Sequence, residues 1–240
     1  MLVCAAVGMV AAYGQYMPQQ AGTVFTYEVV DFEDNGSTDT YGATVTDVTT
    51  SGEGIVTATV VEKHRLESSL IGEVENTVTY TYNPADKMTV NTLLTSDDFK
   101  QMTLMSLKEM FMQAGQYPTD QDMEAISAMI RPKGDVFIEL PAEADAGASI
   151  PNSAIRATIE GQPMGVKITK GTYQGYEEIE VPAGKFNCLK VTYTTTIIGQ
   201  PGDTKVTAWY APGVGLVKQN EADKKGKEKN STVLKEIKNN

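Results

Sequence analysis

The chain has 240 residues, and 20 lysines and arginines against 31 aspartates and glutamates give it a formal net charge of −11 at pH 7. Hydrophobic residues make up 41% of the sequence and charged residues 21%, a balance typical of a globular protein with a sizeable core. The acidic balance disfavours nucleic acid as a partner, because contacts to phosphates need clustered lysine and arginine.

The first residues predict a cleaved export signal. The segment 1–14, MLVCAAVGMVAAYG, is uncharged and apolar, and it is too short to span a membrane as a mature helix. Ala12 and Gly14 place small residues at positions −3 and −1 of a cut before Gln15, the pattern of a signal-peptide cleavage site. We therefore expect a signal peptide at 1–14 and an exported protein, in the periplasm or at the cell surface, with no integral membrane span in the mature chain.

Two alternatives exist for the same segment. Acylation of Cys4 would make the protein a lipoprotein, but Met1-Leu2-Val3 lacks the small residue expected at −1. A buried N-terminal strand is the second alternative. After cleavage Cys188 is the single cysteine, and its apolar neighbours in FNCLKVTY predict a buried, unreactive thiol.

The first third of the mature chain is rich in β-branched and aromatic residues, which predicts strands. Short spacers with turn residues, such as SGEG and NPAD, favour antiparallel hairpins over crossover helices. The expected strands form a β-meander and cover 23–32, 41–50, 54–66, 75–83 and 86–94.

A helical insert is expected at about 96–131. Acidic residues follow Thr95 and Ser96 at the start of the first helix, and Gly115 ends it. The second helix covers 119–130, with Thr119 as its cap. The apolar residues of the first helix surround most of its circumference, so several sides of this helix must be covered.

The methionine-rich helices allow two interpretations. Methionine can fill irregular gaps between the helices and a curved sheet. Alternatively, the helices line a groove for an apolar ligand of variable shape. On the second interpretation the predicted ligand-binding residues are Phe99, Met102, Met105, Met110 and Phe111 on the first helix, and Met123 and Ile126 on the second.

Strands return in the last hundred residues, and two tight hairpins stand out among them. In VPAG, Pro182 presets φ for the turn and Gly184 supplies a left-handed residue. In APGV, Pro212 and Gly213 fit a type II turn, which requires positive φ at the glycine. Gly215 predicts a bulge or a close backbone approach, and Trp209 pins the corner. The expected strands are 135–140, 154–160, 164–174, 176–182, 185–198, 204–211, 214–221 and 231–238.

The two hairpins also carry a family resemblance. The stretches VPAGKFNCLKV (181–191) and WYAPGVGLVK (209–218) resemble those of an exported Gram-negative family of unknown function that includes TapB-like proteins. This resemblance covers about the last third of the chain and implies a periplasmic or surface-exposed antiparallel β protein without an established enzyme activity. In outline the expected architecture is similar to the lipoprotein carriers LolA and LolB, a likeness that transfers no residue roles.

Residue patterns for catalysis are scarce. His64 is the single histidine, so a zinc site built on several histidines is excluded, and no G-x-S-x-G or P-loop motif is present. Carboxylates are plentiful, but no spacing singles out a catalytic pair or a calcium loop. We expect no catalytic residues, no metal site and no cofactor.

The sequence therefore predicts a mainly β (α+β) protein with a single domain over 15–240. Its antiparallel curved sheet or open barrel would have two short helices packed on the concave side. The predicted function is non-enzymatic: an exported envelope protein that binds a lipid or another apolar or amphiphilic ligand between the sheet and the helices. The alternative is an assembly or scaffold protein that recognises an envelope protein partner through a sheet edge. A carboxylate-based hydrolase is a remote third alternative.

Overall fold

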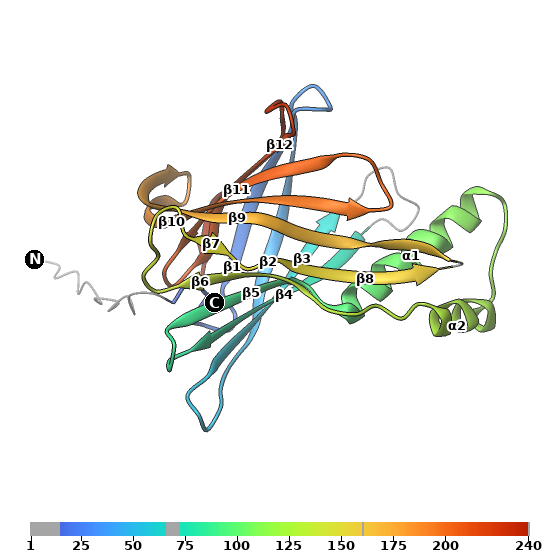
Figure 1. Ribbon diagram of the computed structural model, residues 1–240, viewed down its shortest axis with the longest axis horizontal. Helices are drawn as coiled ribbons and strands as arrows, with labels where there is room; N and C mark the ends of the chain where they lie inside the picture. The colour runs from blue at the N-terminus through green and yellow to red at the C-terminus, as the bar shows by residue number, and fades with distance from the viewer. Residues whose placement is uncertain (1–14, 66–72, 160, 240) are drawn as a thin grey trace, which may run out of the picture.

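The computed structural model describes residues 15–65, 73–159 and 161–239, and the predicted signal at 1–14 lies outside them (Figure 1). Within these residues thirteen strands form one antiparallel sheet, in the order β6-β5-β4-β3-β2-β1-β13-β12-β11-β10-β9-β7, with β8 also paired to β9. The strands are β1 (Val24–Asp31), β2 (Ser37–Thr50), β3 (Val56–Arg65), β4 (Glu73–Asn83), β5 (Met88–Leu94), β6 (Val136–Pro141), β7 (Ser149–Ile150), β8 (Ser153–Ile159), β9 (Gln162–Val181), β10 (Gly184–Ile198), β11 (Asp203–Ala211), β12 (Gly215–Asp223) and β13 (Glu228–Lys238).

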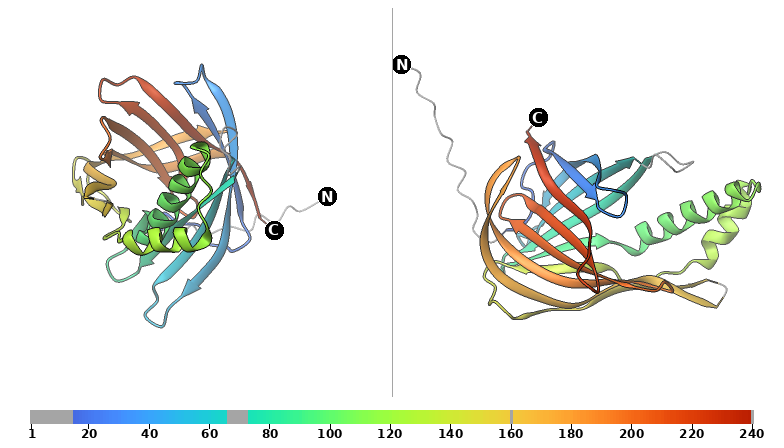
Figure 2. Two further views of the ribbon diagram at one scale, coloured as in Figure 1. Left: turned by 90° about the vertical axis from the view of Figure 1, so that its right-hand side faces the viewer. Right: turned by 90° about the horizontal axis from the view of Figure 1, so that it is seen from above.

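The sheet curls until its two ends meet, so the predicted curved sheet or open barrel is confirmed (Figure 2). The Ser153 hydroxyl of β8 donates to the carbonyl oxygen of Phe137 in β6 at 2.8 Å and accepts from its N–H at 3.0 Å. Lys133, just before β6, forms an isolated antiparallel bridge with Arg156 of β8. The Tyr173 hydroxyl of β9 also donates to the Glu139 carbonyl oxygen of β6 at 3.0 Å, so hydroxyl groups and one bridge hold the seam in place of a strand ladder.

Strands near in sequence are mostly neighbours in space. The expected meander is confirmed, because β1 to β5 pair successively in antiparallel register. The segments predicted separately at 164–174 and 176–182 are one strand, β9, and its pairing with β10 shifts register near Lys190. The first and last strands, β1 and β13, also pair with each other and join the two halves of the sheet.

The helical insert separates the adjacent strands β5 and β6. It contains α1 (Ser96–Gln113) and α2 (Asp120–Met129), close to the predicted bounds. Thr95 caps α1, and Thr119 forms a capping box with Asp122 at the start of α2. The Ser96 N–H donates to Asp135 Oδ1 at 2.9 Å, which ties the start of α1 to the segment before β6.

Two short helices accompany the curved sheet, as expected from the sequence. Both helices extend outward from one end of the barrel (Figures 1 and 2). Only Phe99 and Thr103 of α1 are buried, and α2 has no buried residue. Side chains of the strands fill the interior of the barrel, so only the first turns of α1 reach the core.

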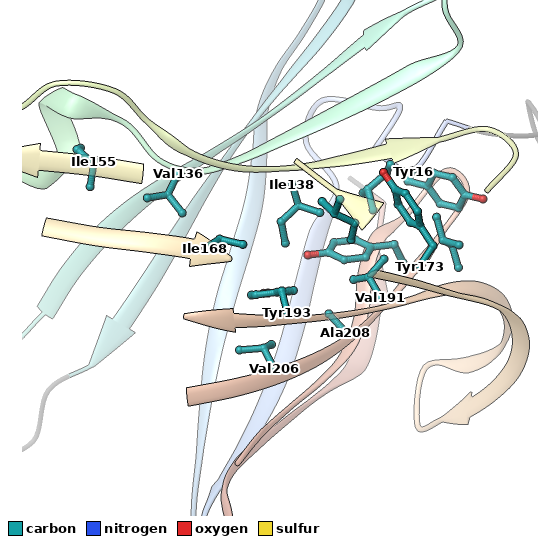
Figure 3. Packing of buried hydrophobic residues seen from close by; sticks show 14 of the residues in the cluster. Tyr16, Val136, Ile138, Ile155, Ile168, Tyr173, Val191, Tyr193, Val206 and Ala208 are labelled. Atoms are coloured by element: carbon teal, nitrogen blue, oxygen red, sulfur yellow. The ribbon is translucent and has the colours of Figure 1, made fainter. Parts of the chain in front are cut away.

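Large side chains fill the inside of the barrel. One buried cluster lies between β6, β8 and the strands β9 to β11 and includes Ile138, Ile155 and Tyr193 (Figure 3). The N-terminal segment contributes Tyr16 to this cluster and Met17 to a second cluster over β1 to β4; the two side chains are 2% and 0% exposed. The segment that follows the predicted cleavage site is therefore part of the core.

Both hairpins expected from the sequence are present. Gly184 has φ +137° at the β9–β10 turn after Pro182. Gly213 has φ +76°, and the Val214 N–H donates to the Ala211 carbonyl oxygen at 3.2 Å, as a type II turn requires. A Cβ at Gly215 would lie 3.0 Å from the Tyr80 hydroxyl oxygen, so this glycine allows a close approach across the barrel.

Trp209 lies on the outer face of β11, because the alternate residues Ala208 and Tyr210 belong to an interior cluster. The ammonium groups of Lys190 and Lys218, directly opposite on the neighbouring strands, lie 5.2 and 5.3 Å from the Trp209 ring centroid. The indole N–H donates to the Glu177 carboxylate, and this hydrogen bond, followed by Lys190 and Lys218, lowers the carboxyl pKa. The tryptophan therefore links β10, β11 and β12 through contacts on the outer face of the sheet.

Candidate functional site

The end of the barrel that carries the helices offers a cavity between α1 and the sheet. It measures about 410 Å³, within the range of small-molecule pockets. The ends of β3 and β4 form one wall and the middle of α1 forms the other. The lining side chains are His64, Val74, Asn76, Met102, Met105, Ser106 and Glu109.

A polar and aromatic cluster borders this cavity. Glu62 Oε2 accepts a hydrogen bond from Asn76 Nδ2 at 3.1 Å and lies 3.4 Å from His64 Nε2. The His64 ring packs against Tyr41 with 4.3 Å between ring centroids, and Tyr41 stacks on Tyr27 at 5.1 Å. The His64 side chain is 36% exposed and lines the cavity, whereas Glu62 lies behind it at 18% exposure.

Deeper in the barrel, tyrosines from opposite walls meet. The Tyr27 hydroxyl donates to the Leu216 carbonyl oxygen at 2.8 Å, and Asn91 Nδ2 donates to the Tyr210 hydroxyl at 3.4 Å. The strands joined by these contacts are not neighbours in the sheet, so the contacts cross the interior. Burial raises the pKa of the interior tyrosines, which keeps them protonated hydrogen-bond donors; they are Tyr27, Tyr41, Tyr80, Tyr193 and Tyr210.

The seven predicted ligand-binding residues do not form one surface. Met102 and Met105 line the cavity. Phe99 is 8% exposed and belongs to the barrel core, whereas Met110 is 54% exposed and faces solvent. The remaining three are half-buried on the two helices: Phe111, Met123 and Ile126.

Sequence reasoning missed the sheet side of the cavity. His64 served only to exclude a zinc site built on several histidines, and Asn76 was not singled out. A signal did exist, because Glu62 and His64 lie two residues apart in β3 and therefore share a face with Val60, which is buried. The position of α1 above this face could not be inferred, since it depends on how the sheet curls.

The described part of the chain has no group of three or more His, Cys, Asp or Glu side chains that could hold a metal ion. Cys188 is fully buried, and desolvation raises the pKa of its thiol to about 12. Within residues 15–65, 73–159 and 161–239, neither α1 nor α2 is both long and apolar enough to cross a membrane.

Two solved structures share this barrel fold. A "putative lipoprotein" from Parabacteroides distasonis has a TM-score of 0.64 and 19% identity, covering 94% of this chain and 99% of its own. A "putative exported protein with YmcC-like fold" from Bacteroides fragilis has a TM-score of 0.61 and 15% identity, with the same two coverages. At these identities the likeness shows the fold alone.

The family model described as DUF3108-like matches residues 20–234, and the chain therefore belongs to the DUF3108-like family. This match agrees with the expected family of unknown function, whereas the resemblance to TapB-like proteins stays a prediction. No curated protein matches the sequence.

Proposed function

We propose that this protein is an exported, non-enzymatic binding protein whose methionine-rich end accepts an apolar or amphiphilic ligand. The observation that carries the proposal is the cavity of about 410 Å³ between α1 and the ends of β3 and β4. Its two methionines offer flexible, polarisable side chains that adapt to ligands of variable shape. His64 and Asn76 provide hydrogen-bonding groups for the polar end of an amphiphile.

The alternative, recognition of an envelope protein through a sheet edge, has less support. An edge strand recruits a partner through its unpaired N–H and C=O groups. Here β6, at one end of the strand order, meets β8, which pairs with β9 near the other end, through the Ser153 hydroxyl. The bridge between Lys133 and Arg156 extends this contact. The hydroxyl groups of Ser153 and Tyr173 occupy the Phe137 N–H and the Phe137 and Glu139 carbonyl oxygens, which leaves fewer backbone groups on this edge of β6 for a partner strand.

The binding proposal is tested with Met105→Asp. We expect the wild-type protein to bind the neutral fluorescent amphiphile N-phenyl-1-naphthylamine. The variant should lose affinity by about tenfold or more, because an apolar ligand would then displace water from an unpaired carboxylate. Fluorescence titration at pH 7 measures the affinity, and far-ultraviolet circular dichroism checks the strand content.

Met110→Asp is the matched control, because Met110 lies on the same helix but faces solvent and does not line the cavity. Its affinity for the probe should equal that of the wild type. A wild-type protein that binds no neutral amphiphile, or a control that loses as much affinity as Met105→Asp, contradicts the proposed site.

The export part of the proposal places cleavage between Gly14 and Gln15. The descriptions of the two similar structures, which mention a lipoprotein and an exported protein, support export. A cut before Gln15 also leaves the core complete: the Gln15 carbonyl oxygen accepts from the Gly213 N–H at 2.8 Å, and Tyr16 and Met17 are buried. Mass spectrometry of protein from the envelope fraction should find Gln15 as the first residue; a retained segment 1–14 or an acylated Cys4 contradicts this expectation.

A further inference from the structure

A second cavity at the helical end of the barrel is lined by basic side chains. It measures about 540 Å³ and lies where the segment after α2 passes the hairpin of β8 and β9. Arg131, Lys133 and Arg156 contribute cationic groups to its lining. Met129, Met164 and Ile198 contribute apolar surface. None of these six residues belongs to the cavity beneath α1.

The charge of this cavity is opposite to that of the chain. The chain has a net charge of −11, yet this lining combines three basic residues with no acidic residue. Among the described residues, none of the three basic side chains forms an ion pair with a carboxylate. Their positive charge is therefore available to a bound anion.

Two of the charges are held directly opposite each other by the backbone. The Lys133 N–H donates to the Arg156 carbonyl oxygen at 2.8 Å, and the Arg156 N–H donates to the Lys133 carbonyl oxygen at 3.0 Å. Side chains of such a directly opposed pair point to the same face, where like charges repel. An anion between them converts this repulsion into two attractive contacts.

The apolar residues indicate what carries the anion. Met129 is 56% exposed although it is a large apolar side chain, and Met164 and Ile198 are half-buried beside it. An inorganic anion would leave this surface in water, whereas an alkyl chain would cover it. A broad anionic membrane surface fits less well, because acidic residues at the start of the neighbouring helix α2 would be repelled; they are Asp120, Asp122 and Glu124.

We propose that this basic cavity binds a single anionic amphiphile. A phosphate or carboxylate group contacts Lys133, Arg156 and Arg131, and the alkyl chain lies along Met129, Met164 and Ile198. This inference goes beyond the proposed function, since it concerns a separate cavity and a defined ligand charge. Ligand binding in this cavity can be tested independently of ligand binding beneath α1.

The test uses isothermal titration calorimetry on the mature chain with lauroyl lysophosphatidic acid below its micelle concentration. The variant Lys133→Gln/Arg156→Gln should lower the affinity by about tenfold or more, since it removes both opposed charges but leaves their backbone bridge intact. Added salt should weaken wild-type binding more than variant binding. Binding of N-phenyl-1-naphthylamine should be unchanged in the variant, which separates this site from the cavity beneath α1.

The matched control is Lys205→Gln/Lys227→Gln, which removes the same charge from exposed positions outside both cavities. This control should bind the lipid with the affinity of the wild type. If it lost as much affinity as Lys133→Gln/Arg156→Gln, the effect would come from the net charge of the chain, and the proposal would be overturned. If inorganic phosphate bound as tightly as the lipid, the cavity would be a simple anion site and the proposed alkyl contact would be wrong. If the uncharged lauroyl glycerol bound as tightly as the lipid, the basic residues would not contribute to binding. Binding to anionic vesicles without binding to monomeric lipid would replace the proposal by a membrane-surface interaction.

Discussion

Replacement of Tyr16 by alanine should lower the free energy of unfolding of the protein by about 3–5 kcal/mol, the usual cost of truncating a buried aromatic side chain. Tyr16 is 2% exposed and packs in the interior cluster with Ile138 and Tyr173 (Figure 3). Its N–H donates to Thr89 Oγ1 at 3.2 Å. Because domains are stable by only about 5–15 kcal/mol, this one change would remove a large share of the total. Urea denaturation followed by circular dichroism measures the effect.

Two further variants separate packing from other effects. Burial, followed by a hydrogen bond with Tyr176, raises the pKa of the Tyr16 hydroxyl. Tyr16→Phe keeps the ring and removes this hydroxyl, which should cost only about 0.5–1.5 kcal/mol. Gln19→Ala changes an exposed residue of the same segment and should cost less than about 0.5 kcal/mol. An unchanged urea midpoint for Tyr16→Ala would show that the N-terminal segment does not belong to the core.

Gly165→Ala should destabilise the protein by more than about 3 kcal/mol, because backbone atoms occupy the place of its side chain. Gly165 lies in β9 opposite Arg156 of β8 and has φ +150°. A Cβ there would lie 2.0 Å from the Ile155 carbonyl oxygen, which a rigid strand cannot avoid by a side-chain movement. The change should separate β8 from β9 and open the seam that β8 forms with β6.

Gly213→Ala is the control for backbone strain alone. Gly213 also has positive φ, +76°, but no atom lies within 4 Å of the place of its Cβ. We expect a cost of about 1–3 kcal/mol for this variant, the strain of a non-glycine residue in that conformation. Equal urea midpoints for the two variants would mean that the close approach at Gly165 adds nothing.

Much of the local structure could be predicted from the sequence, because local rules decide it. β-branched and aromatic runs placed the strands of the meander within a few residues of their bounds. Thr95 and Thr119 marked the starts of both helices, since a threonine hydroxyl accepts from a free N–H of the first turn. Pro212 and Gly213 determined a turn whose φ angles few other residues adopt.

The candidate sites depend on contacts that no local pattern encodes. His64 and Met105 meet only because the sheet curls under α1, and Lys133 faces Arg156 only because β6 and β8 close the barrel. The outward position of the helices was decided in the same way: the interior was already filled by strand side chains and by Tyr16 and Met17. The sequence by itself thus determined the elements, their caps and their turns. The tertiary structure decided the seam, the closed core and both cavities, because each arises from residues far apart in the chain that only the curvature of the whole sheet brings together.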